Sequence, residues 1–284
     1  MDAKTRLCCL IGNPVGHSLS PMIHNTLADE LGINLCYTAF KVEKDRLHEA
    51  VAGADAFDIL GMNVTVPHKC EIIKELSDID PLAARIGAVN TLVRVDGGYK
   101  GYNTDAIGLY RELEEENIII KEVIILGAGG ASNAITYICA DKGAAKIYLL
   151  NRTFDKAKKL ADDVNSHFGD VVVPLAISDY RLIPEGKYPV IQTTSCGLYP
   201  HNDDAPIYDK EFYELVEAGV DIIFNPAKTM FMKLCKESGA RAYNGLKMLL
   251  YQGIAAFELW NDIKVPKNLA DKILGMMERK LKES

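Results

Sequence analysis

The sequence predicts an α/β protein with parallel sheets, and two observations carry this prediction. Short apolar runs typical of buried strands alternate with longer stretches of helical pattern along most of the chain. After about residue 105 a helical and charged stretch interrupts this alternation, which begins again at Val123, so we expect a domain boundary near residue 105. The 284 residues of the chain suffice for one large or two ordinary domains.

In the first half, three apolar runs are predicted as strands: RLCCLIG at 6–12, LCYTAFKV at 35–42 and ILGMNVTV at 59–66. The first predicted helix covers 20–31, with the Ser20 hydroxyl as its cap and Pro21 in its first turn. A second helix is expected from about Asp45 and a third from Pro67.

A hairpin is predicted from two strand-like runs, 90–95 and 99–102, on either side of Asp96-Gly97-Gly98, because glycine tolerates positive φ. A helix is expected over 103–116. The second half predicts strands at 123–127, 146–150, 171–175, 190–194 and 220–224, with helices between them. The last segment, 245–284, is expected to be helical except around Pro266.

Composition and charge exclude several classes of protein. With 48% hydrophobic and 25% charged residues, the chain is typical of a soluble globular protein. Its net charge of −7 argues against a nucleic-acid binder. We expect no signal peptide and no membrane span, because no sufficiently long apolar run is present. The seven cysteines form no C-x-x-C pair, so we expect free thiols in the cytoplasm and no metal site.

A glycine-rich turn follows the strand predicted at 123–127. Gly127 and Gly129 in VIILGAGGAS lie between a strand and a helix, where small residues let backbone amides approach a pyrophosphate. Ser132 stands at the third glycine of the usual fingerprint. The motif alone is also compatible with a tight turn that binds no ligand.

The next predicted strand ends in Asn151-Arg152-Thr153. At this position NAD-binding folds usually carry an acidic residue for the ribose 2′-hydroxyl. A carboxylate would repel a 2′-phosphate, whereas Arg152 can form charge-assisted hydrogen bonds with it. Thr153 either adds a hydroxyl donor or caps the following helix. The sequence therefore predicts NADP as the cofactor.

Polar residues in the first half indicate a second site. Ser18 and Ser20 lie two residues apart, so their hydroxyls can form a carboxylate clamp, although Ser20 can equally be a helix cap. Asn63 and Thr65 project to one face of a predicted strand.

Two charged residues and an asparagine belong with this group. Lys69 is predicted in a first helical turn, where a cation is unfavourable, although a solvated surface lysine is the ordinary interpretation. Asp105 is expected at the start of a helix, where it can also serve as a cap. Asn90 begins a predicted strand.

The order of the motifs HSLSP, NVTVPHK, GAVNT, GYNTD, GAGGAS, NRT and NGLKMLLYQG resembles the shikimate dehydrogenase family over nearly the whole chain. The resemblance implies reversible NADPH-dependent reduction of 3-dehydroshikimate to shikimate, in the biosynthesis of aromatic amino acids through chorismate. It implies a substrate-binding α/β domain of residues 1–104 and 245–284, and an inserted Rossmann-like NADP-binding domain of residues 105–244. A homodimer is a family-level expectation.

The resemblance also implies roles for individual residues. Ser18 and Ser20 would bind the substrate carboxylate, and Lys69 with Asp105 would form the catalytic pair. The ring hydroxyls would be bound by Thr65, Asn90, Asp105 and Gln252.

On the cofactor side, the pyrophosphate would lie against Gly127, Ala128, Gly129, Gly130 and Ala131. The adenosine phosphate would be bound by Asn151, Arg152 and Thr153, and the nicotinamide would lie near Ile222 and Gly245. Phe224 stands before Asn225-Pro226 in the substrate site, where many relatives have tyrosine, so a hydroxyl that can reach the substrate is missing.

Two alternatives stay open. A quinate/shikimate dehydrogenase would use a broader range of substrates and both NAD and NADP; such relatives often carry an acidic residue after Asn-Arg, whereas Thr153 is neutral. A catalytically silent regulatory protein that senses the cofactor would be expected to lack Lys69 or Asp105, and both are present.

Overall fold

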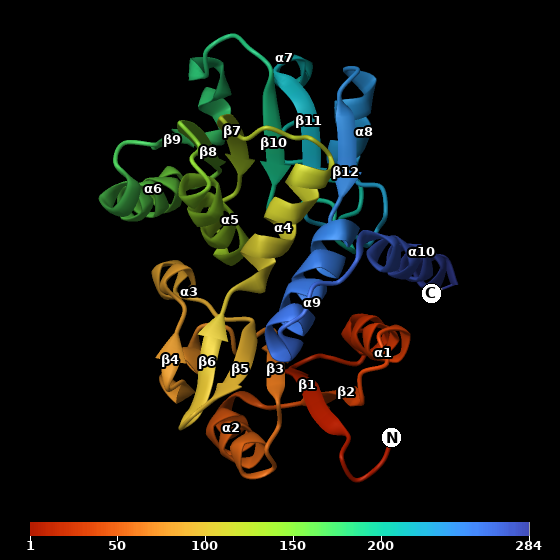
Figure 1. Ribbon diagram of the computed structural model, residues 1–284. Helices are drawn as coiled ribbons and strands as arrows, with labels where there is room; N and C mark the ends of the chain where they lie inside the picture. Colours follow the sequence, from red (N-terminus) through yellow and green to blue (C-terminus); the bar gives the residue numbers. More distant parts are fainter. Residues whose placement is uncertain (284) are drawn as a thin grey trace. The chain divides into compact units, whose positions relative to one another are not determined.

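The structure is a computed structural model that describes residues 1–283, and it contains two compact units (Figure 1). Unit 1 consists of Met1–Gly108 and Leu249–Ser284, of which Ser284 lies outside the described residues, and unit 2 of Leu109–Met248. The chain passes from one unit to the other within two helices, α4 (Thr104–Glu115) and α9 (Leu246–Asn261).

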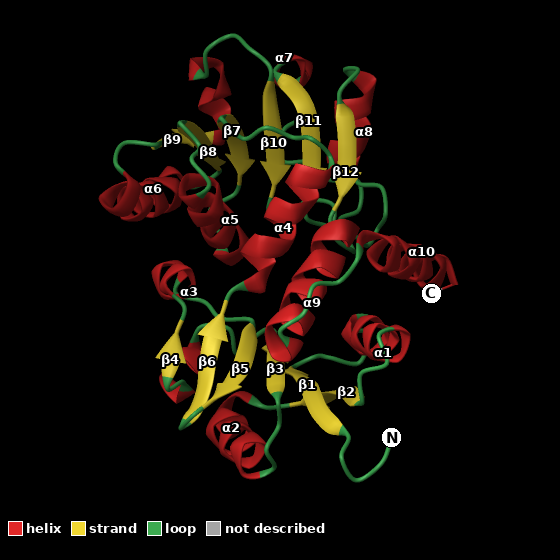
Figure 2. Ribbon diagram, viewed as in Figure 1, coloured by secondary structure: helices red, strands yellow, loops and turns green. Residues whose placement is uncertain are grey.

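Unit 1 is built around a mixed six-stranded sheet with the order β2-β1-β3-β5-β6-β4 (Figure 2). Its parallel part pairs β1 with β2 and β3, and its antiparallel part pairs β5 with β3 and with β6. The predicted hairpin is confirmed, with Val95 paired to Gly98 across a two-residue turn. The strands are β1 (Arg6–Gly12), β2 (Leu35–Lys41), β3 (Gly61–Val64), β4 (Asp78–Ile79), β5 (Thr91–Val95) and β6 (Gly98–Tyr102).

Helices cover both faces of this sheet. Residues of α2 pack on one face together with Cys9, Ile11 and Leu92. On the other, α9 docks through Trp260, whose Nε1 donates to Leu92 O at 2.8 Å and leaves no room for a side chain at Gly61. The C-terminal helices therefore complete the first unit. The helices with bounds not yet given are α1 (Ser20–Glu30), η1 (Lys44–Arg46), α2 (Leu47–Ala56), η2 (Glu71–Glu75), α3 (Pro81–Ile86) and α10 (Lys267–Glu283).

The predicted helix at Pro67 does not form. Residues 66–70 are turns, and the 3-10 helix η2 follows from Glu71. Proline lacks an N–H and keeps the residue before it extended. The buried His68 ring bonds Val42 O at 2.8 Å, and Val89 N donates to Lys69 O, so tertiary contacts hold this segment as a turn.

Unit 2 contains a parallel six-stranded sheet with the order β12-β11-β10-β7-β8-β9. This is the 3-2-1-4-5-6 order of doubly wound sheets, in which ligands bind at the carboxyl ends of the strands near the point where the order reverses. That point lies between β7 and β10. The strands are β7 (Glu122–Leu126), β8 (Lys146–Asn151), β9 (Val172–Ala176), β10 (Tyr188–Gln192), β11 (Val216–Asp221) and β12 (Arg241–Asn244).

Two layers of helices enclose this second sheet. The cluster that contains Ile124, Leu150 and Val190 packs against η3, α7 and α8, whereas α5 and α6 contribute no residue to it and cover the other face. The prediction of helices between all strands is only partly right, because a short 3-10 helix stands between β9 and β10. The helices are α5 (Gly130–Asp141), α6 (Phe154–Phe168), η3 (Ile177–Leu182), α7 (Lys210–Glu214) and α8 (Met230–Glu237).

The strand expected at 220–224 lies earlier in the chain, because β11 ends at Asp221. Phe224 is therefore in the loop after β11 rather than in the strand. Strand β12, helix α3 and strand β4 were not predicted from the sequence. Within residues 1–283, no helix has the length and apolar content needed to cross a membrane.

Candidate active site

A lysine and a carboxylate form a partly exposed ion pair in unit 1. Lys69 Nζ lies 2.7 Å from Asp105 Oδ2, and the two side chains are 31% and 24% exposed. Asp105 is in the first turn of α4, where a carboxylate is favoured. Lys69 is in the turn before η2, so the prediction that it occupies a first helical turn is wrong. The fold thus brings an ammonium group and a carboxylate together at a position that solvent can reach.

Asn90 lies at the centre of a buried hydrogen-bond network beside this pair. Its Oδ1 accepts from the Thr104 backbone N at 2.7 Å and from the hydroxyls of Thr104 and Thr91. Among residues 1–283, no hydrogen bond uses its Nδ2, so this group can donate to a ligand. Asn103 caps α4, since its Oδ1 accepts from Ala106 N at 3.1 Å. Asp105 is therefore not the cap of this helix.

Asn63 belongs to this hydrogen-bond network, because both ends of its side-chain amide bond to groups of the protein. Its Oδ1 accepts from the Tyr37 hydroxyl at 2.7 Å, and its Nδ2 donates to Thr91 Oγ1 at 3.0 Å. Thr65, the other polar residue of this segment, is partly exposed. Its methyl group lies where a Cβ at Gly12 would be, so Gly12 provides the space for Thr65.

Ser18 and Ser20 lie together at the start of α1. Ser18 Oγ donates to Ser20 Oγ at 3.1 Å and accepts from Ser20 N at 3.2 Å. The N-cap of the helix is Leu19, which has no side-chain cap bond, so Ser20 is a helical residue and its predicted role as the cap is wrong. On α9, Gln252 is largely buried, and its Nε2 donates to Leu249 O at 2.9 Å.

The glycine turn of unit 2 joins β7 to α5, as predicted. Gly127 has a φ of +110°, and a Cβ there would approach Thr193 Oγ1 to 2.6 Å. Gly129 is the N-cap of α5 without a side-chain cap bond, and a Cβ at Gly129 or Gly130 would enter open space. Ser132, which replaces the third glycine, donates to Gly127 O at 2.6 Å and closes the turn. The amides of the first helical turn are left for an external anion, which fits a pyrophosphate.

Arg152 and Thr153 lie exposed directly after β8. Thr153 occupies the N-cap position of α6, but its side chain makes no cap bond, so the alternative that it only caps the helix is not supported. Asn151 Nδ2 donates to Thr153 O at 2.8 Å and fixes the loop.

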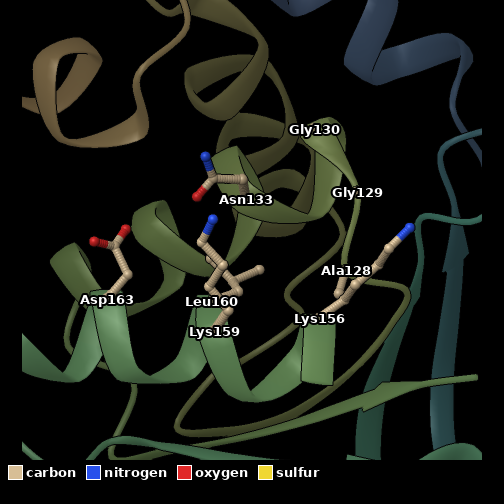
Figure 3. A pocket seen from close by; sticks show the side chains of 8 residues that line it. All are labelled: Ala128, Gly129, Gly130, Asn133, Lys156, Lys159, Leu160 and Asp163. Atoms are coloured by element: carbon tan, nitrogen blue, oxygen red, sulfur yellow. The ribbon is translucent and has the colours of Figure 1, made fainter. Parts of the chain in front are cut away.

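A cavity of about 640 Å³ adjoins the glycine turn (Figure 3). Lys156 and Lys159 of α6 line it and were not predicted, although their spacing after NRT places them one helical turn apart. Figure 3 shows Lys159 directed towards Asn133, while Lys156 extends away past Ala128. Within residues 1–283, Arg152, Lys156 and Lys159 form no ion pair. The lining residues are Ala128, Gly129, Gly130, Asn133, Lys156, Lys159, Leu160 and Asp163.

A second cavity of unit 2, of about 320 Å³, lies at the carboxyl ends of β10 and β11. Both Ile222 and Phe224 line it. Gly245 N donates to Ile223 O, and a Cβ at Gly245 would lie 2.1 Å from Ile222 O, so only glycine fits there. The fold thus brings Gly245 and Ile222 together. The lining residues are Thr193, Thr194, Ser195, Leu198, Ile222, Ile223, Phe224 and Asn225.

Three family models match the chain. The shikimate dehydrogenase substrate binding domain matches residues 10–92, the shikimate / quinate 5-dehydrogenase model residues 111–177, and the shikimate 5′-dehydrogenase C-terminal domain residues 245–272.

Similar proteins agree with these matches. A shikimate dehydrogenase (NADP(+)) of Bacillus cereus is 45% identical over 281 residues, covering 94% of this chain and 98% of the relative. A crystal structure of shikimate 5-dehydrogenase from Listeria monocytogenes, in complex with shikimate and NAD, has a TM-score of 0.90 and 33% identity, covering 96% of this chain and 98% of the other. For shikimate 5-dehydrogenase from Thermus thermophilus, in complex with NADP(H) and shikimate, the TM-score is 0.83 and the identity 31%, covering 95% and 99%. The chain belongs to the shikimate dehydrogenase family.

Proposed function

We propose that the protein is an NADP-dependent shikimate dehydrogenase, an oxidoreductase that reversibly reduces 3-dehydroshikimate to shikimate in the biosynthesis of aromatic amino acids. The observation that carries this proposal is the Lys69–Asp105 pair, with a separation of 2.7 Å and partial exposure, within the framework of this family. A buried structural ion pair would not be left open to a ligand.

The substrate side is assigned to unit 1. Ser18 and Ser20 bring two hydroxyls to a helix start, where they donate to the carboxylate of the substrate. Asn90 donates through its Nδ2 to a ring oxygen, because its Oδ1 is held by Thr104. Thr65, Asp105 and Gln252 complete the recognition of the ring hydroxyls. Phe224, where many relatives have tyrosine, has no hydroxyl to donate to the substrate.

The chemistry of the chain's own residues is proton transfer. Reduction of a ketone leaves an alkoxide that must gain a proton, and a positioned acid lowers this barrier by a factor of about 10²–10⁴. Lys69 Nζ donates this proton and Asp105 Oδ2 holds the ammonium group in place. NADPH supplies the hydride when it is bound.

The cofactor side is assigned to unit 2. The open face of Gly129 and Gly130 lets the pyrophosphate approach the first amides of α5, with Gly127, Ala128 and Ala131 completing the cradle. Arg152, with Asn151 and Thr153, binds the 2′-phosphate, and Lys156 adds a second cation. Ile222 lines the cavity assigned to the nicotinamide, and Gly245 lies against the backbone of Ile222.

The functional division of the chain also belongs to this proposal. We assign substrate binding to residues 1–104 and 245–284 and NADP binding to residues 105–244; the compact units are divided a few residues later, after Gly108 and Met248. Location in the cytoplasm and assembly into a homodimer are further parts of the proposal. Cell fractionation and sedimentation equilibrium test them.

The deciding experiment compares initial rates of shikimate and quinate oxidation, each with NADP⁺ and with NAD⁺. The proposal requires activity mainly with shikimate and NADP⁺, and its loss in Lys69→Ala. Comparable rates with quinate or NAD⁺ would instead establish a quinate/shikimate dehydrogenase. An absence of activity with both substrates would refute the enzymatic assignment.

A further inference from the structure

A buried carboxylate that catalysis does not use lies at the carboxyl end of β11. Asp221 is fully buried, and it accepts hydrogen bonds from three residues of two different segments. Its Oδ2 accepts from Thr229 Oγ1 at 2.6 Å, and its Oδ1 accepts from Ile223 N at 3.0 Å and from Gln192 Nε2 at 3.3 Å. One side chain thus holds the end of β10 and both ends of the loop 222–229.

No cation compensates this carboxylate. In the part of the chain that the structure describes, Asp221 forms no ion pair, and burial raises its pKa to about 6. The other titratable groups that face it are the thiol of Cys235 on α8 and the hydroxyl of Tyr213 on α7, both buried. An unpaired buried carboxylate is costly, so stability alone would favour a neutral residue. We therefore look for the role of Asp221 in the hydrogen bonds that its carboxylate accepts.

Gln192, a hydrogen-bond partner of Asp221, also bonds to a second loop, which begins at Thr193. Gln192 Oε1 accepts from Thr194 N, and Gln192 Nε2 also donates to Cys196 O at 3.1 Å. Thr229 in turn caps α8 by accepting from Met232 N at 3.3 Å. The loops that begin at Thr193 and at Ile222 are thus joined through one carboxylate.

Together these two loops provide the entire lining of the cavity of about 320 Å³ described above. Neither loop contains regular secondary structure between residues 193 and 198 or 222 and 229. A backbone bond from Ile222 N to Gln192 O at 3.1 Å joins their starts, and the side-chain hydrogen bonds of Asp221 and Gln192 hold residues further along each loop. Asp221 is buried and is not among the residues that line the cavity, so it acts through the two loops.

We infer that Asp221, with Gln192 and Thr229, is a positioning residue that sets the width of the nicotinamide pocket. This inference rests on the proposed function, because the cavity is assigned to the nicotinamide there. Loss of one of its hydrogen bonds lets the two loops separate, which weakens binding of the nicotinamide end of NADP without affecting the adenosine end.

The test compares two ligands that share the adenosine end. NADP⁺ occupies both ends of the site, whereas adenosine 2′,5′-bisphosphate occupies the adenosine end alone. Thr229→Val removes a hydroxyl at nearly constant volume and Thr229→Ser retains it. We expect Thr229→Val to weaken NADP⁺ binding about five- to tenfold, as for the loss of one hydrogen bond, and Thr229→Ser to restore it. The dissociation constant of adenosine 2′,5′-bisphosphate should stay within twofold in both variants, as measured by calorimetry.

Asp221→Asn adds a pH readout. Protonation of Asp221 removes an acceptor, so it should weaken NADP⁺ binding relative to bisphosphate binding as the pH decreases through about 6. The 5′-phosphate of the bisphosphate also titrates at about pH 6, so the ratio of the two affinities in the wild type is divided at each pH by the same ratio in Asp221→Asn. This quotient should fall as the pH decreases, because the variant shares the titration of the ligands but lacks that of Asp221. Asp209→Asn, which alters a helix-capping carboxylate of α7 in the same unit, is the matched control and should retain the pH dependence of the wild type.

If Thr229→Val weakened the binding of both ligands equally, the variant would show a general loss of structure and the inference would be overturned. Unchanged binding of both ligands would also overturn it. These outcomes are distinct from failure of the proposed function, in which the wild-type protein itself would not bind NADP⁺ or oxidise shikimate.

Discussion

At the scale of single residues, the pairing of Lys69 with Asp105 should matter for the reaction far more than for stability. A partly exposed ion pair contributes about 0–1 kcal/mol to folding. We therefore predict that Lys69→Ala lowers kcat for shikimate oxidation by about 10²–10⁴-fold, the usual contribution of a positioned acid or base. Its melting temperature should stay close to that of the wild type, measured by circular dichroism.

Lys74→Ala is the matched control, because Lys74 lies in the same segment and pairs with Glu71 at an exposed position. Its kcat should be unchanged. If Lys69→Ala retained kcat within a few fold of the wild type, the proposed proton donor would be wrong.

Arg152 should determine the choice between the two nicotinamide cofactors. It is exposed and forms no ion pair within residues 1–283, so a 2′-phosphate can become its counter-ion. We predict that Arg152→Gln raises KM for NADP⁺ by about 10–100-fold, the range for a hydrogen bond to a charged group, and leaves KM for NAD⁺ nearly unchanged. Lys158→Gln, on the same helix but paired with Asp162, should alter neither value. Equal effects of Arg152→Gln on both cofactors would contradict the assignment.

At the scale of elements, α4 carries a buried acid that should make stability depend on pH. Burial raises the pKa of Glu112 to about 8, with Glu115 and Glu116 nearby adding to the effect and Lys247 opposing it. The folded protein therefore keeps a proton on Glu112 that the unfolded chain loses above its ordinary pKa of 4.5. This contribution to stability is complete at low pH and declines as the pH rises from about 4.5 to 8.

Glu112→Gln removes this dependence, because the glutamine is neutral in both states. We predict that the variant is more stable than the wild type at pH 8, by an amount on the order of a few kcal/mol, and that the difference shrinks towards pH 5. Urea unfolding at pH 5, 6.5 and 8 measures this difference in the free energy of unfolding. The exposed Glu114→Gln should show no comparable trend, and a constant difference across this range would disprove the role of Glu112.

The elements that the sequence predicted correctly are those with a strong local signal. Strands such as β7 and β8 are continuous apolar runs, and the hairpin has glycine at its turn. The prediction of a helix at Pro67 was wrong because the hydrogen bonds that hold this segment, from His68 to Val42 and from Val89 to Lys69, join residues far apart in sequence. The prediction that Ser20 caps α1 was wrong for a different reason, since the Ser20 N–H itself donates to Ser18 Oγ.

At the scale of the whole molecule, motifs revealed which residues could serve each site but not how the fold completes it. Lys69 and Asp105 are 36 residues apart, and their contact depends on how β3 and α4 are placed in unit 1. Lys156 and Lys159 resemble ordinary surface lysines of a helix until the adjoining cavity is seen. No sequence pattern indicated a role for Asp221, because a carboxylate at the end of a strand is common. Its role becomes visible only with the three buried groups that donate hydrogen bonds to it.

The assignment of one ligand to each unit can be tested on the intact protein by hydrogen exchange. Adenosine 2′,5′-bisphosphate should slow amide exchange in unit 2, at 127–131 and 151–156, because its phosphates bind the backbone amides and cations there. Shikimate should instead slow exchange in unit 1, at 18–20 and 65–69 and around Asn90. Inorganic phosphate at equal concentration is the control for general anion effects. Protection by shikimate confined to Leu109–Met248 would refute the proposed division, since every polar group assigned to the substrate lies outside that range.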